Sequence, residues 1–123
     1  MTATTFTAVT PNQTGNAVTF TAASNNGAGD LIPVSPTAMT VVLVQNTDAG
    51  GAHTVTFTSQ PDEWGNTGAS LNKTVSVPLS STAAVQLSPP SRWAASTVGT
   101  CIITYAAYSD MNIAVLNVPW QSV

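Results

Sequence analysis

The sequence predicts a single all-β domain, folded as an antiparallel sandwich or jelly roll of about eight strands with essentially no helix. Threonine, valine, serine, asparagine and glycine dominate the chain, and no stretch repeats apolar residues at helical spacing over several turns. Short runs instead alternate apolar and polar residues between turn-forming clusters. The 123 residues fit one domain, in which residues 1–10 and 119–123 are candidate arms.

The first two predicted strands are residues 4–10 and 17–22. Each places a phenylalanine on its apolar face, Phe6 in the first strand and Phe20 in the second. Residues 23–36 combine small and turn-forming residues with two prolines, and they are predicted to form a surface loop.

The stretch 37–59 is predicted to be the central hairpin. Its first strand, residues 39–45, is apolar on both faces, which is typical of a strand covered on both sides. Its second strand, residues 53–59, alternates apolar residues with threonine, as expected for a sheet with one buried face. Gly50 and Gly51 between the strands supply the backbone freedom that a hairpin turn requires.

Four more strands follow in the second half of the chain. The last two are apolar on both faces, so we expect them to lie in the middle of a sheet or against a neighbouring subunit, and to flank or cover the central hairpin. The four predicted strands are residues 73–79, 83–87, 100–108 and 112–119.

Charge is scarce in this chain. Two basic and five acidic residues make 6% of the sequence, against about 25% in ordinary soluble domains. Such depletion favours a surface covered by another protein, whereas the alternative is that hydroxyl and amide side chains keep a free monomer soluble. Two cations allow few phosphate contacts, so nucleic acid is not an expected partner. No apolar run spans a membrane and the first ten residues lack a signal peptide, so we expect neither a membrane partner nor secretion.

No catalytic, cofactor or metal site is expected, so the chain is not predicted to be an enzyme. His53 opens a strand on the face of Val55 and Phe57, and it is interpreted as a histidine at the rim of the core. Asp62 and Glu63 point to opposite faces if extended, and no EF-hand spacing surrounds them. Cys101 lies in an apolar strand and is predicted to be a small buried side chain.

Tryptophan marks the candidate contact residues. Trp64 and Trp93 fall in predicted loops and Trp120 falls near the end of the chain, where tryptophan is often an interface hot spot. The alternative is that each indole folds back as a cap on the core. The consecutive prolines of the segment LSPPSRW, Pro89 and Pro90, stiffen it into an extended conformation that suits docking.

The order of these motifs resembles that of small tailed-bacteriophage proteins that decorate or cement the capsid. The likeness covers roughly residues 3–118. It rests on the step Val44, Gln45, Asn46 before a glycine-rich turn, the strand TVSVP at 74–78, LSPPSRW at 87–93 and two paired final strands. The sharpest matches are Pro89, Pro90, Arg92 and Trp93. Leu87 and Ser88, the PDEWGN loop and the VPWQSV tail depart from the pattern.

The resemblance implies a non-enzymatic structural protein of the virion, assembled in the host cytoplasm and bound to the major capsid protein on the capsid surface, commonly as a homotrimer. The expected partner-binding residues are Trp64, Pro89, Pro90, Arg92, Trp93 and Trp120. The alternative function is a carbohydrate-binding or host-surface-binding sandwich of a phage tail or secreted scaffold, with Trp64 and Trp93 as stacking platforms.

Overall fold

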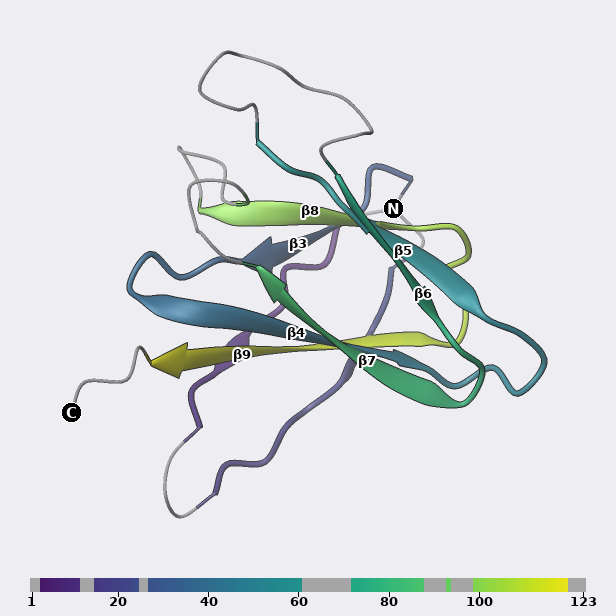
Figure 1. The fold of residues 1–123 in the computed structure, drawn as a ribbon, viewed down its shortest axis with the longest axis horizontal. Coiled ribbons are helices and arrows are strands. Elements are labelled where there is room, and N and C mark those ends of the chain that lie inside the picture. Colours follow the sequence, from purple (N-terminus) through teal and green to yellow (C-terminus); the bar gives the residue numbers. More distant parts are fainter. Residues whose placement is uncertain are drawn as a thin grey trace.

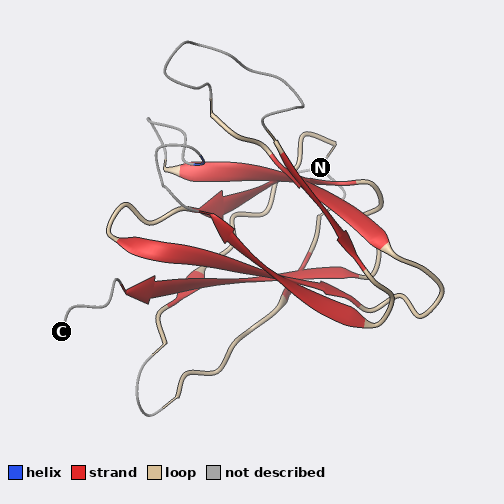
Figure 2. Cartoon of the chain, viewed as in Figure 1, coloured by secondary structure: helices blue, strands red, loops and turns tan. Residues whose placement is uncertain are grey.

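The computed structural model describes residues 3–11, 15–24, 27–60, 72–87, 93 and 99–119, and these residues form two β-sheets packed face to face (Figure 1). Apart from Trp93, which has helical backbone, they lie in strands, turns and loops (Figure 2). The described part of the chain contains no helix that could cross a membrane. The strands are β1 (Ala8–Val9), β2 (Thr21–Ala22), β3 (Asp30–Pro33), β4 (Ala38–Asn46), β5 (His53–Phe57), β6 (Lys73–Val77), β7 (Ser81–Leu87), β8 (Thr100–Tyr105) and β9 (Met111–Pro119).

The strand order is that of a jelly roll. One sheet has the order β1-β9-β4-β7, with β2 also paired to β9, and the other has the order β3-β8-β5-β6. From β2 to β9, each consecutive pair of strands lies in opposite sheets, except β5 and β6, which pair with each other. This interleaving distinguishes the jelly roll from a sandwich of simple hairpins. The predicted all-β sandwich is therefore confirmed.

The predicted central hairpin at residues 37–59 is wrong. Both of its strands form, but β4 pairs with β7 and β9, whereas β5 pairs with β6 and β8 in the other sheet. Residues 47–52 are therefore a crossover between the sheets. Stacked sheets lie about 10 Å apart, and six residues can span that gap, whereas the tightest hairpins need only about two.

The final two strands lie in the middle of their sheets, as the sequence predicted. β8 lies between β3 and β5, and β9 lies between β4 and the short strands β1 and β2. They flank β4 and β5, one in each sheet. The resemblance implied that the two strands pair with each other, but they lie in different sheets. Their mid-sheet positions explain why both sequences are rich in apolar residues.

Three crossovers meet at one end of the sandwich, which we call the crossover end. They are residues 47–52, 78–80 and 106–110, and backbone hydrogen bonds join them. The Thr47 amide donates to the Asp110 carbonyl at 2.8 Å, and the Ser80 amide donates to the Asp48 carbonyl at 3.1 Å. Asn46 lies beneath them, 1% exposed, and its side-chain amide donates to the carbonyls of Gly51 and Val77 at 3.0 and 3.1 Å.

The core lies between the two sheets. The inward side chains of β4 and β9, including Val42, Val44 and Val115, pack against those of the opposite sheet, including Phe57 and Ile103. Each of these five side chains is at most 1% exposed. The alternation of buried and half-buried residues along β4 gives the strand one face toward this core.

The first 36 residues differ most from the prediction. The predicted loop at residues 23–36 contains β3, and the predicted strand at 17–22 is regular only at β2. Phe6 is buried, and its amide donates to the Leu31 carbonyl at 3.0 Å, while the Leu31 amide donates to Thr4 at 2.9 Å. This part of the candidate N-terminal arm therefore lies along the edge of β3 on the body of the domain.

Candidate interaction surfaces

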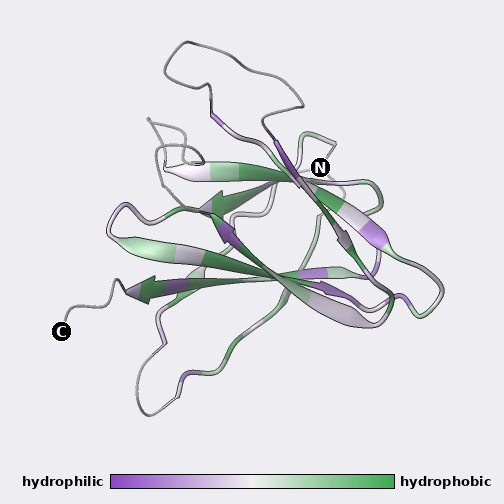
Figure 3. Ribbon diagram, in the orientation of Figure 1, coloured by the Kyte–Doolittle hydropathy of each residue, from purple (hydrophilic) through white to green (hydrophobic). Residues whose placement is uncertain are grey.

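The outer face of the five-stranded sheet carries apolar side chains and no charge. We define the outer face as the side chains of β1, β4, β7 and β9 that alternate with the core-facing ones. The half-buried apolar members are Val9, Met39, Val41, Leu43, Leu116 and Val118, and the polar members are Gln45, Thr82, Gln86 and Asn112. Figure 3 shows the apolar stretches along β4 and β9.

The prediction that β4 is covered on both faces is therefore wrong for the chain by itself. Val42 and Val44 face the core with no exposed surface, but Val41 and Leu43 on the other face are half-buried. Their register neighbours on β9 continue this outer row: Leu116 is half-buried and the small Ala114 is buried. An outer face of this kind is covered fully only when another surface lies against it.

Asp30 is a fully buried carboxylate that ties three segments of the chain together. Its oxygens accept hydrogen bonds from the amides of Thr4 and Ser24, both at 2.9 Å, from the Ser24 hydroxyl, and from the Tyr105 hydroxyl at 2.7 Å. Burial alone would raise the pKa of Asp30, but these donors outweigh it and hold the pKa below its ordinary value of 3.8. The four donors satisfy a charge that would otherwise be costly to bury.

His53 lies at the crossover end with an acceptor at each ring nitrogen. Nε2 lies 2.9 Å from the Asp48 carboxylate and Nδ1 lies 3.3 Å from the Ala107 carbonyl. Only the protonated ring can donate to both acceptors. The hydrogen bond to Asp48 raises the pKa of His53 above 6.5, and burial opposes it; the nearby carboxylate of Asp110 adds to the rise. The interpretation of His53 as a rim histidine is confirmed, since its side chain is 10% exposed.

The thermal midpoint of the protein is expected to fall as the pH rises from 6 to 8.5. His53 has a higher pKa in the folded chain than its ordinary value, so its stabilisation is complete below pH 6.5 and is lost as the pH rises through the raised pKa. Scanning calorimetry of the wild type and of His53→Gln measures this dependence. The variant should show a flatter profile over this range, and an identical slope in both proteins would contradict the assignment.

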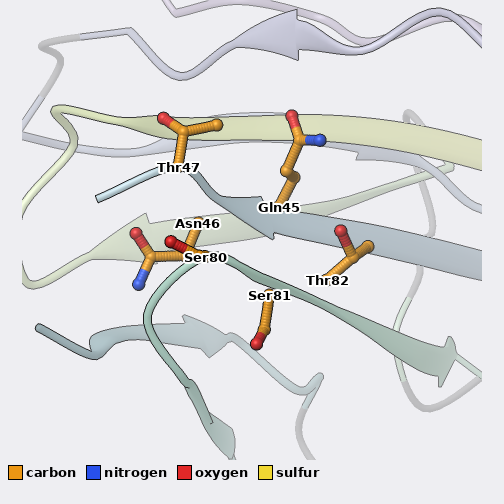
Figure 4. A pocket seen from close by; sticks show the side chains of 6 residues that line it. All are labelled: Gln45, Asn46, Thr47, Ser80, Ser81 and Thr82. Carbon is orange, nitrogen blue, oxygen red and sulfur yellow. The ribbon is translucent and has the colours of Figure 1, made fainter. Parts of the chain in front are cut away.

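A shallow polar pocket of about 260 Å³ lies where β4 ends and β7 begins. Figure 4 shows the side chains that line it, which offer hydroxyl and amide groups and no charge. Asn46 is already committed to the crossover carbonyls, and its own oxygen accepts from the Asp48 amide at 2.9 Å. The lining residues are Gln45, Asn46, Thr47, Ser80, Ser81 and Thr82.

Trp93 is the predicted contact residue that the structure describes, and it is buried. Its exposed fraction is 2%, it belongs to the core cluster, and Lys73 Nζ lies 5.9 Å from the centre of its ring. Burial contradicts the interpretation of Trp93 as an exposed contact or sugar-stacking platform, and it supports the alternative in which the indole caps the core. The other predicted contact residues, Trp64, Pro89, Pro90, Arg92 and Trp120, lie outside the described residues.

Titratable and metal-ligating groups give no further cluster in the described ranges. Burial raises the pKa of the Cys101 thiol to about 12, which keeps it protonated, as expected for a buried thiol. No group of three or more His, Cys, Asp or Glu side chains within this part of the chain could hold a metal ion. The Asp30 network has no specific signal in the sequence except a lone acid before the apolar pair Leu31 and Ile32.

Comparisons of the chain with protein-family models, with curated proteins and with solved structures find no match.

Proposed function

We propose that this chain is a capsid decoration protein, also called a cement protein. It binds the outer surface of an assembled phage head and stabilises the contacts between capsomers. The observation that carries the proposal is the uncharged outer face of the five-stranded sheet, whose apolar side chains the chain itself covers only in part. A rigid jelly roll that presents such a face suits a protein that works by covering a surface.

The scarcity of charge supports the same function. The chain has two basic and five acidic residues in 123, and one of the acids, Asp30, is buried within the fold. The remaining surface charge provides little electrostatic repulsion against other protein surfaces. A protein that binds only the assembled lattice stabilises that lattice by mass action, so no turnover is needed. The major capsid protein is the proposed partner, and the trimer implied by the resemblance is the proposed assembled unit.

Binding to heads is expected to depend on the outer face. Empty heads assembled from the major capsid protein of the same genome are mixed with the chain and sedimented, and bound copies are counted by gel densitometry. Leu43→Glu places a charge in the apolar row and should lower occupancy at least tenfold. The matched control is Thr74→Glu, at an exposed position of β6 in the other sheet, which should bind like the wild type.

Two results would contradict the proposal. The first is a wild-type chain that does not sediment with the heads at any concentration tested. The second is equal occupancy by Leu43→Glu and Thr74→Glu, provided that both variants keep the thermal midpoint of the wild type.

The alternative function, a carbohydrate-binding module, has less support. Trp93 is not a stacking platform because its indole is 2% exposed, and the polar pocket at the crossover end has no aromatic side chain in its lining. Titration with soluble glycans, followed by tryptophan fluorescence, distinguishes the two functions. Saturable quenching together with absent head binding would favour the carbohydrate module.

A further inference from the structure

Three of the four sheet edges in the described part of the chain are protected against pairing with another strand. The outer edge of β9 holds β1 and β2, which are only two residues each. The N-terminal segment covers the edge of β3 through the hydrogen bonds of Thr4, Phe6 and Leu31. The edge strand β6 begins with Lys73 and is followed by Pro78. Short strands, covers, lysine and proline are the usual means by which proteins blunt sheet edges.

No described segment protects the edge of β7. Among the described strands it pairs with β4 alone, and it runs for seven residues, STAAVQL, without charge or proline. Its outward side chains, Thr82, Ala84 and Gln86, are exposed. A long, uncharged edge presents a row of backbone donors and acceptors to any strand that approaches it.

We propose that β7 pairs with β7 of a second copy of this chain, in antiparallel register about a two-fold axis at Ala84. In this register Ser81 lies opposite Leu87 of the partner copy, Thr82 lies opposite the partner's Gln86, and the small Ala84 side chains meet at the centre. The two five-stranded sheets then form one continuous sheet, and their outer faces join. The inference does not rest on the proposed function: the two-fold contact joins copies in pairs and is distinct from the contacts that would build the proposed trimer.

Charge favours a second copy and the antiparallel direction. A strand that pairs with itself about a two-fold axis must not carry a charge near its centre, and β7 carries none. Asp48 and Asp110 lie at the crossover end beside Ser81, where the single His53 offsets only one of the two acids, whereas Lys73 lies at the far end of β6, toward Leu87. Antiparallel pairing sets the acidic end of one copy toward the Lys73 end of the other, whereas parallel pairing would align the acids.

A charge-pair experiment tests this contact. Ala84→Lys and Ala84→Glu each place like charges opposite each other at the two-fold axis, so each variant alone should self-associate at least tenfold more weakly than the wild type in sedimentation velocity. An equimolar mixture of the two variants should recover wild-type association. Thr74→Lys and Thr74→Glu on the β6 edge are the matched controls and should associate like the wild type.

A second measurement does not depend on electrostatics. Ala84→Cys should form a disulfide-linked dimer under mild oxidation, because opposed residues in antiparallel strands lie within disulfide range and Cys101 is buried. Thr74→Cys should stay uncrosslinked. A wild type that remains monomeric at millimolar concentration, or a trimer unaffected by both Ala84 variants, would overturn the proposal. The proposal would also be overturned if the Ala84 variants lost head binding but kept wild-type self-association. That result would assign the β7 edge to a contact with the capsid.

Discussion

Replacing Asp30 with asparagine is expected to lower the free energy of unfolding by about 3 kcal/mol or more, since hydrogen bonds to a charged group are each worth about 1.5 to 3 kcal/mol. The carboxylate has no exposed surface and accepts from Thr4, Ser24 and Tyr105. An asparagine side chain offers one acceptor oxygen and turns an NH₂ group toward donors, so buried donors are left without partners. Urea unfolding followed by tryptophan fluorescence measures the loss.

Two control variants separate the network from general effects of substitution. Tyr105→Phe removes one donor and should cost about 1.5 kcal/mol, while Asp110→Asn changes an exposed acid and should cost less than about 0.5 kcal/mol. Because the pKa of Asp30 is lowered in the folded chain, its stabilisation is present above pH 3.8 and is lost as the pH falls through the lowered value. Asp30→Asn should lack this acid dependence. An asparagine variant as stable as Asp110→Asn would show that the carboxylate does not hold the three segments together.

Replacing Gly29 with alanine is expected to cost about 4 kcal/mol or more, at the upper end of single substitutions. The φ angle of Gly29 is +94°, and a Cβ atom there would lie 2.5 Å from the Ile103 carbonyl oxygen and 2.9 Å from the side chains of Ile102 and Thr104. The backbone of β8 cannot yield without losing its pairing with β3, which begins at the next residue. Soluble yield and thermal midpoint measure the effect.

Alanine substitutions at two other glycines separate the backbone strain at Gly29 from the steric clash of the added methyl group. Gly15 has a φ angle of +87°, but an added methyl group there would meet nothing within 4 Å, so Gly15→Ala reports backbone strain alone, about 1 to 2 kcal/mol. Gly51 has open space and no positive φ, so Gly51→Ala should be neutral or slightly stabilising. If Gly29→Ala were no less stable than Gly15→Ala, the close approach of β3 and β8 would be refuted.

Strand positions after residue 36 were predictable because apolar alternation is a local property of the sequence. The predicted strand at 53–59 alternates apolar residues with threonine, and β5 covers its first five residues, His53–Phe57, with Val55 and Phe57 buried. The partners of each strand were not predictable, because a hairpin and a crossover use the same turn residues. The pairings that place β4 and β5 in different sheets are long-range, and the hydrogen bond from the buried Asn46 amide to the Val77 carbonyl of β6 is one such long-range contact.

The candidate surfaces were predictable only in part. The scarcity of charge indicates a covered surface, but it does not say which face is covered. The two-sided apolar pattern of residues 39–45 does locate the outer face, once β4 is known to lie inside a sheet with one side toward the core. The burial of Trp93 depends on contacts with strands distant in sequence, which residue type alone cannot indicate.

Electron cryo-microscopy of heads with and without the added chain is the most direct test of the proposed decoration function. Heads assembled from the major capsid protein of the same genome are imaged before and after the chain is added in excess. We expect added density on the outer surface at symmetric sites between capsomers, into which the jelly roll fits with the outer face of β4 and β9 covered. Heads with no added density at saturating chain would contradict the account.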